Sequence, residues 1–146
     1  MKKVQLAAFI AVLCLLVSCK VEPEQINYGS DACHFCKMTI VDQQHAAQFV
    51  TSKGKQFKYD AIECMVNELA EKKRDDIAIL LVADYNSPGH MTSAISSVYL
   101  ISPAIKSPMG ANLSGFVTEN DALAAKGEND GELYSWVALL KKFDAE

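Results

Sequence analysis

Apolar residues in the middle of the chain follow patterns that are typical of β-strands. Segments 46–51 and 56–59 have strand character and flank 52–55, a loop of hairpin length in which Gly54 can take a positive φ. The continuous apolar run 77–83 has the length of a strand that is buried on both faces, so we expect it at the centre of a sheet. Two further strands are predicted, at 97–102 and 113–118.

A helix is predicted where apolar residues recur at intervals of three and four positions. Asp60 and Glu63 have the spacing of a capping box, so this helix is expected to begin at Asp60 and to run to about Lys73. Its buried stripe is predicted to contain Ile62, Met65, Val66 and Leu69. Towards the C-terminus, a short helix capped by Thr118 or Asn120, a polar turn at 127–131 and an amphipathic helix at 132–143 are predicted.

The order of these elements suggests an internal repeat. A pair of strands leads twice into a capped helix, and Tyr59-Asp60-Ala61-Ile62 is similar to Asn120-Asp121-Ala122-Leu123. We therefore predict an α+β fold of two small ββα-type repeats packed side by side, the first over about 33–84 and the second over about 94–143.

The first 18 residues have the pattern of a bacterial export signal. Two lysines near the N-terminus precede an apolar run that is short for a membrane span. The run ends in Leu16-Val17-Ser18-Cys19, which resembles the lipobox of bacterial lipoproteins. An ordinary signal peptide with an incidental cysteine is the alternative.

The lipobox resemblance implies cleavage before Cys19 and attachment of lipid to this residue. Residues 1–18 are then a lipoprotein signal peptide, 19–32 a lipidated tether and 33–146 the folded domain. The acyl chains imply a lipoprotein anchored in a membrane and facing the periplasm. Lys20, rather than an aspartate, follows the cysteine, which favours the outer membrane.

Composition narrows the function classes. The 146 residues carry 14 basic and 18 acidic side chains, a net charge of −4, and removal of the signal takes away two lysines. Such a chain has no basic surface for nucleic acid. Neither a Gly-x-Ser-x-Gly motif nor a phosphate-binding loop occurs in the sequence, so a binding protein is favoured over an enzyme.

Cysteine usage points to metal chemistry. Cys14 leaves with the signal and Cys19 is lipidated, so Cys33, Cys36 and Cys64 remain. An odd number leaves at least one thiol unpaired in an oxidising compartment. Cys33-x-x-Cys36-x-Met38 places three sulfurs near one point, and Cu(I) prefers thiolate and thioether ligands.

The same spacing leaves three other interpretations open. The first is a local disulfide between Cys33 and Cys36. The second is a thiol–disulfide or organometal-cleaving enzyme that uses this pair. The third is a structural zinc module with Cys64 and a nitrogen ligand. Candidate nitrogen ligands are His34, His45 and His90.

Sulfur also occurs outside this motif. Cys64 falls on the side of its helix opposite the apolar stripe, so we expect it to meet a second layer or to line a site. Met109 stands between Pro108 and Gly110 in a loop, an arrangement that suits presentation of a side chain to a ligand. Met65 lies within the stripe and is expected chiefly in the core.

Four short motifs occur in a defined order: Cys33-x-x-Cys36-x-Met38, Tyr59-Asp60-x-x-x-Cys64-Met65, Ala83-Asp84-Tyr85 and Ser107-Pro108-Met109-Gly110. Together they resemble the NosL family of copper-binding lipoproteins over residues 33 to about 126. One departure is Lys37, which stands where the family commonly has glycine.

The resemblance implies a fold similar to the core of organomercurial lyase and Cu(I) as the bound metal. It implies delivery of Cu(I) to a copper-receiving enzyme or its assembly machinery, with nitrous oxide reductase as the expected client. Carried over by position, Cys33, Cys36, Met38 and Met109 are the first candidate ligands, followed by Cys64 and Met65.

Overall fold

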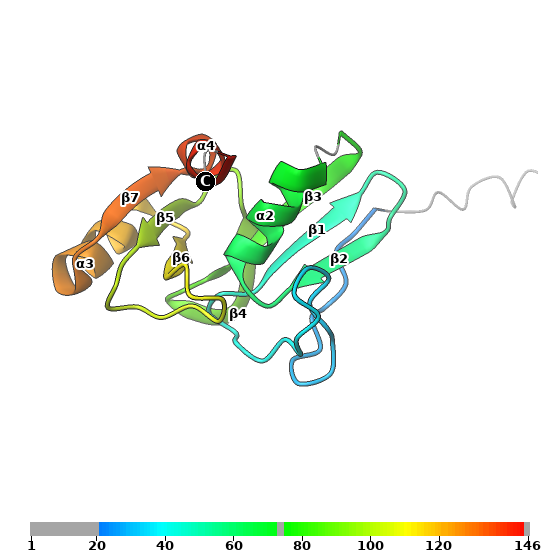
Figure 1. Ribbon diagram of the computed structural model, residues 1–146, viewed down its shortest axis with the longest axis horizontal. Coiled ribbons are helices and arrows are strands. Elements are labelled where there is room, and N and C mark those ends of the chain that lie inside the picture. Colours follow the sequence, from blue (N-terminus) through cyan, green and yellow to red (C-terminus); the bar gives the residue numbers. More distant parts are fainter. Residues whose placement is uncertain (1–20, 73–74, 145–146) are drawn as a thin grey trace, which may run out of the picture.

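The computed structural model describes residues 21–72 and 75–144, which form two antiparallel sheets and three helices (Figure 1). One sheet has four strands in the order β2-β1-β3-β4, and the other has three in the order β6-β5-β7. The predicted α+β class is confirmed. No helix in the described ranges is long and apolar enough to cross a membrane.

The predicted hairpin is formed by β1 (Ala47–Thr51) and β2 (Gln56–Tyr59). The strands pair antiparallel with Phe49 opposite Phe57, and the two rings stack with their centroids 4.5 Å apart. Gly54 in the connecting loop has a φ of 81°, the conformation for which the sequence supplies glycine.

Helix α2 (Ile62–Lys72) buries most of its predicted stripe, with Ile62, Met65 and Val66 fully inside. The predicted capping box is not formed, so this prediction was wrong. The Asp60 carboxylate accepts from the backbone N–H of Val41 at 3.4 Å, and Glu63 is engaged by a distant loop. Because both side chains bond to distant segments, neither caps the helix, which begins at Ile62.

Strand β3 (Ile77–Asp84) lies between β1 and β4, as its apolar run predicted. Strand β4 (Ser87–Ser93) was not among the strands predicted from the sequence. Its residues are mostly exposed and include Pro88 and Gly89. An edge strand pairs on one side only, so it tolerates proline and needs no apolar alternation.

The second unit contains β5 (Val98–Ile101), β6 (Leu113–Phe116), α3 (Glu119–Asn129), β7 (Glu132–Ser135) and α4 (Trp136–Asp144). Strands β5 and β6 and the Thr118 cap are confirmed, since the Thr118 hydroxyl accepts from Asp121 N at 3.1 Å.

Two boundaries in this unit differ from prediction. Helix α3 continues through Gly127 and ends where Asp130 and Gly131 take positive φ. Residues 132–135 form β7, paired with β5, instead of the first turn of an amphipathic helix. Hydrogen bonding to β5 overrides the helical period here. A side chain at Gly131 would place its Cβ 2.3 Å from the carbonyl oxygen of Ile101, so this crossing requires glycine.

The two units have the same topology. Elements β1-β2-α2-β3 and β5-β6-α3-β7 each place their first strand between the other two. Each repeat is therefore ββαβ, one strand longer than predicted. The expected sequence match was misaligned by four residues: Tyr59 at the end of β2 corresponds to Phe116 at the end of β6, not to Asn120.

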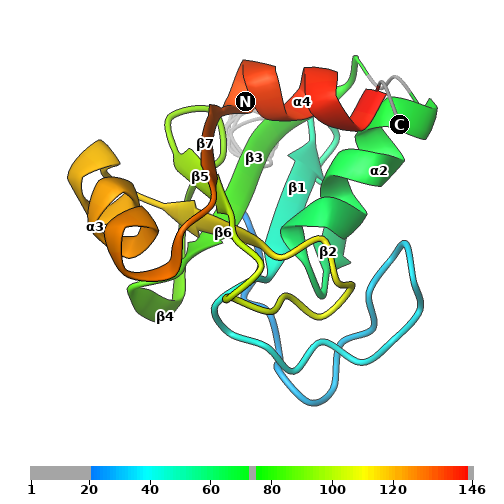
Figure 2. The same cartoon turned by 60° about the vertical axis from the view of Figure 1, so that its left-hand side comes forward.

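The units join along β3 and β6. The Tyr85 N–H donates to the Gly115 carbonyl at 2.8 Å, and a Cβ at Gly115 would lie only 3.3 Å from Ala83 O. Helix α4 packs on α2 across the top of both sheets (Figure 2). The larger of two hydrophobic clusters therefore runs through both units, from Phe49 to Leu139, and a smaller one lies in the second unit around Leu100 and Phe116.

The N-terminal segment folds back along β2. Ile26 is buried, and Lys58 Nζ donates to the Gln25 carbonyl at 2.8 Å and to Asp31 Oδ2 at 2.7 Å. Part of the expected 19–32 tether is thus packed against the domain.

Candidate metal centre

Three free thiols meet at the N-terminal end of α2. The Sγ atoms of Cys33, Cys36 and Cys64 all lie within 4.8 Å of one another. Cys33 and Cys64 are buried, whereas Cys36 is half-buried. Two segments that are about thirty residues apart in sequence therefore form one cluster, in which Cys36 is the partly exposed member.

A tight backbone turn presents the first two thiols. Cys33 N donates to Met38 O at 2.7 Å, and Lys37 N donates to Cys33 O at 3.0 Å. Lys37 has a φ of 66°, in the left-handed region that favours glycine. The lysine at position 37, where glycine was expected from the family resemblance, therefore adopts a backbone conformation that glycine would adopt at lower cost.

The thiols hold one another in different protonation states. A hydrogen bond from the Cys64 thiol outweighs burial and lowers the pKa of Cys33 to about 5, helped by the backbone N–H groups of Asp60 and Cys36. The bond to Cys33, followed by burial, raises the pKa of Cys64, and burial raises the pKa of Cys36. At neutral pH the metal-free cluster therefore contains one thiolate and two thiols.

This donor set suits a soft cation. Thiolate is the form of cysteine that binds metal, and three sulfurs without oxygen favour Cu(I) over hard ions. Binding of such an ion would displace the two remaining protons, and the ion would take their place between the sulfurs.

The Cys33–Cys36 turn is attached to α2 by a buried carboxylate. His34 Nδ1 lies 2.7 Å from Glu68 Oε2, and the Tyr59 hydroxyl donates to the same oxygen at 2.8 Å. Lys72 Nζ donates to Glu68 Oε1 at 2.8 Å. Burial alone would raise the pKa of Glu68, but the hydrogen bonds from Lys72, His34 and Tyr59 hold it below its usual value.

The loop that carries Met109 is hydrogen-bonded to Glu63, the residue that precedes Cys64 in α2. Glu63 Oε1 accepts from the Ser107 hydroxyl and, at 3.3 Å, from the Ala111 N–H. Gly110 N donates to Ser107 O at 3.1 Å and closes the turn that contains Met109.

The predicted methionines have different environments. Met109 and Met38 are exposed, at 42% and 52% of their surface, whereas Met65 is fully buried in the core as expected. The three cysteines form the candidate site, and the methionine ligands stay predictions.

Histidine is absent from the thiol cluster in the described part of the chain. His34 is bound to Glu68, and His45 lies between Asp42 Oδ2 at 3.0 Å and Ser114 Oγ at 3.2 Å. His90 is exposed on β4. The zinc interpretation therefore has no nitrogen ligand at the site.

Sequence reasoning placed Cys64 away from the apolar stripe and expected a second layer or a site there. The structure confirms this expectation, since Cys64 is 1% exposed against the N-terminal segment. The burial of Glu63 and Glu68, the two buried glutamates of α2, was missed. Glutamate on a helix normally signals a solvated face, so no local pattern distinguished them.

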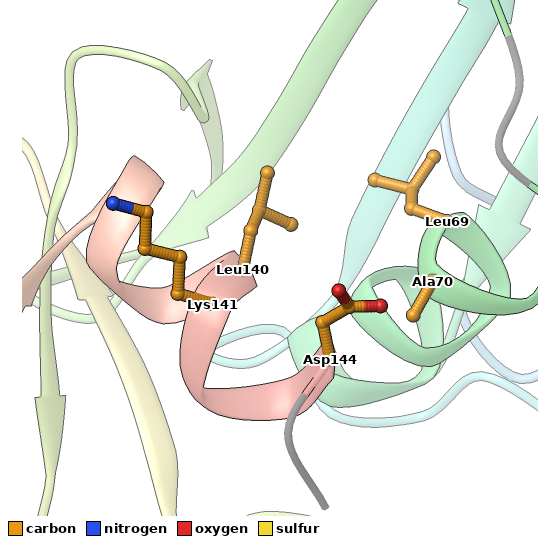
Figure 3. Close-up of a pocket in the computed structure, with 5 residues that line it drawn as sticks. All are labelled: Leu69, Ala70, Leu140, Lys141 and Asp144. Atoms are coloured by element: carbon orange, nitrogen blue, oxygen red, sulfur yellow. The ribbon is translucent and has the colours of Figure 1, made fainter.

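An apolar groove of about 280 Å³ lies elsewhere, between α2 and α4 (Figure 3). Its lining consists of Leu69, Ala70, Leu140, Lys141 and Asp144. It contains no sulfur ligand, and it faces the C-terminal half of α2, whereas Cys64 lies in the first turn.

Fold and site together define a small α+β protein with a three-thiol centre for a soft metal ion. The family model of NosL matches residues 25–142, so the chain belongs to the NosL family. The chain is 32% identical over 114 residues to the copper-binding lipoprotein NosL of Stutzerimonas stutzeri. That match covers 73% of this chain and 60% of the length of the relative.

A solved structure supports the fold. The crystal structure of the copper chaperone NosL from Shewanella denitrificans matches with a TM-score of 0.70 over 80% of this chain and 93% of that chain. The sequences are 18% identical over this match, so the comparison speaks to the fold alone.

Proposed function

We propose that this protein binds one Cu(I) ion through Cys33, Cys36 and Cys64 and passes it to a copper enzyme. The observation that carries the proposal is the convergence of three Sγ atoms within 4.8 Å. Membership of the NosL family and the copper-binding relative from Stutzerimonas stutzeri support the choice of metal.

The exposure of the site suits transfer. Cys33 and Cys64 hold the ion from the protein side, while half-buried Cys36 faces the opening. An incoming thiolate or thioether displaces Cys36 first, and the ion passes on through an intermediate with shared ligands. Copper stays Cu(I) throughout, so no electron acceptor is needed.

Exposed thioethers are candidates for the remaining ligands. Met38 follows Cys36 by two residues, and Met109 projects from a loop attached beside Cys64. Each would add one neutral sulfur to the thiolates. Met65 is a weaker candidate, because reaching a metal would require it to leave the core.

Family membership and the N-terminal sequence support a proposal for the destination of the copper and the location of the protein. We propose that Cys19 is lipidated, that the protein faces the periplasm from a membrane, with the outer membrane favoured, and that nitrous oxide reductase or its assembly machinery receives the copper. Residues 1–20, including the expected signal, lie outside the described residues.

Transfer kinetics test the proposal. Cu(I)-loaded protein is mixed anaerobically with rising concentrations of a chromogenic Cu(I) chelator. A carrier with an open site exchanges by associative attack, so the rate should rise in proportion to chelator concentration. A rate that is independent of the chelator would show that copper must first dissociate, and it would contradict the proposed hand-over.

One observation favours a thiol enzyme as the second candidate, since a pKa of about 5 for Cys33 resembles that of reactive cysteines. Full burial of Cys33 opposes it. Turnover of a disulfide or organomercurial substrate that is unchanged in Met109→Leu would support the enzyme. A structural zinc module would instead unfold on chelation, whereas a copper carrier should stay folded when its metal is removed.

A further inference from the structure

We propose that Glu63 and Ser107 are positioning residues that hold Met109 beside the thiol cluster. The inference rests on the proposed function, because it assigns Met109 to the same copper site. Neither residue is expected to touch copper.

The attachment is formed by buried groups. Glu63 is 2% exposed and Ser107 is 7% exposed. The Ser107 hydroxyl donates to Glu63 Oε1 and accepts from Asn112 N at 2.8 Å. The Ala111 N–H donates to the same carboxylate oxygen at 3.3 Å.

These bonds determine where Met109 lies. Ser102 N donates to Asn112 O at 3.1 Å and closes the base of the loop, and Gly110 N donates to Ser107 O at its tip. Between these points the loop is fixed to α2 through Glu63. Figure 2 shows this loop, in yellow before β6, beside the N-terminal end of α2. Met109 itself stays exposed, two residues from the attached serine.

A stabilising role alone does not account for Glu63. Burying a carboxylate is costly unless its oxygens are satisfied, and Oε2 of Glu63 is buried without a hydrogen-bond partner in the described residues. An apolar residue at this position would avoid that cost. The carboxylate does achieve one thing that an apolar residue does not, which is to bind the Met109 loop.

The position of Glu63 links the two sulfur sources. Glu63 precedes Cys64 in the first turn of α2, so one residue holds the loop and the next supplies a thiol. A shift of this turn on metal binding would carry the loop anchor with it. Helix α2 thereby fixes the position of the Met109 thioether relative to the thiol of Cys64.

A double-mutant cycle on the full chain tests the inference. Cu(I) affinity is measured by anaerobic chelator competition for wild type, Ser107→Ala, Met109→Leu and the double variant. We expect each single substitution to weaken binding by about tenfold, the scale of positioning effects around metals. The double variant should be no weaker than Met109→Leu alone.

Two further variants serve as controls. Ser107→Thr keeps the hydroxyl and should restore wild-type affinity. Ser97→Ala removes another buried hydroxyl, which donates to Ser93 O at 2.7 Å in the turn before β5, and should leave affinity unchanged. Equal losses from Ser107→Ala with and without Met109 would overturn the inference, and so would a Met109→Leu variant that binds normally.

The metal-free protein separates this inference from the function it rests on. Amide hydrogen exchange at Ala111 and Asn112 should accelerate in Ser107→Ala, whether or not the protein binds copper. Unchanged exchange would show that the loop is held otherwise and would overturn the positioning role. Failure of the wild-type chain to bind Cu(I) would instead reject the proposed function.

Discussion

The Nδ1 atom of His34 lies 2.7 Å from Oε2 of Glu68. Through this contact, the turn that carries Cys33 and Cys36 is fixed to the helix that carries Cys64. The imidazole ring also packs edge-on against Phe57, with centroids 4.7 Å apart. A residue inside the cysteine motif thus fixes the two thiols of the candidate site to α2 through its contact with Glu68.

Replacing His34 by Phe should therefore weaken Cu(I) binding while the fold persists. Phenylalanine keeps the ring contact with Phe57, and Glu68 keeps Tyr59 and Lys72 as donors. We expect a loss of about tenfold in affinity in chelator competition, because a less constrained turn aligns its thiols poorly. His90→Phe on exposed β4 is the matched control and should bind normally. Equal affinities of the two variants would show that this contact has no effect on the site.

The low pKa of Cys33 predicts how stability depends on pH in the metal-free, reduced protein. Between the folded value of about 5 and the unfolded value of about 8.5, the unfolded chain holds a proton that the folded chain lacks. The free energy of unfolding should therefore rise with pH, by up to about 1.4 kcal/mol per unit. This contribution is fully present above the unfolded pKa and is lost as the pH falls through 5.

Urea denaturation at pH 6, 7 and 8 measures this slope. In the unfolded chain Cys36 and Cys64 titrate near about 8.5 while their folded pKa values are raised, so they oppose the Cys33 effect towards pH 8 and the slope should be steepest between pH 6 and 7. The shifts of Asp60 and Glu68 act at lower pH. Cys33→Ser should lose most of the slope. An unchanged slope in that variant would mean that another group carries the pH dependence.

Lys37 predicts a stabilising substitution. A non-glycine residue in the left-handed region costs about 1 to 2 kcal/mol, and part of this returns as extra entropy of an unfolded glycine. Lys37→Gly should therefore raise the free energy of unfolding of the metal-free protein by about 0.5 to 1 kcal/mol.

Lys53→Gly is the control for this substitution. Lys53 is also exposed in a loop but has no positive φ, so glycine there should destabilise slightly. Thermal melts of both variants give the comparison. Destabilisation of similar size at both positions would show that the turn at residue 37 carries no strain.

Local patterns predicted the elements whose neighbours are near in sequence. The 52–55 loop and its two strands form a hairpin, and the stripe of α2 is buried as its period indicated. The run 77–83 is central because it is apolar on both faces. These features depend on residues within about ten positions of each other, which is the range that periodicity samples.

Features that depend on distant pairing were not predictable in this way. Strand β7 exists because β5 offers its free edge, about thirty residues earlier. For Cys64, helical geometry predicted a second layer or a site on that side of α2, but it did not identify the N-terminal segment as the partner. Likewise, Glu63 and Glu68 resemble surface glutamates until the loop of Ser107 and the turn of His34 are brought against them.

The most direct test of the account asks whether Cys64 belongs to the copper site with Cys33 and Cys36. A chain that begins after Cys19, with all thiols reduced, is titrated anaerobically against a chromogenic Cu(I) chelator alongside its Cys64→Ser variant. We predict one equivalent of tight binding for the parent chain and a loss of at least about tenfold in affinity for the variant. Equal affinity of the two proteins would contradict the three-thiol centre and leave Cys33 and Cys36 as an isolated pair.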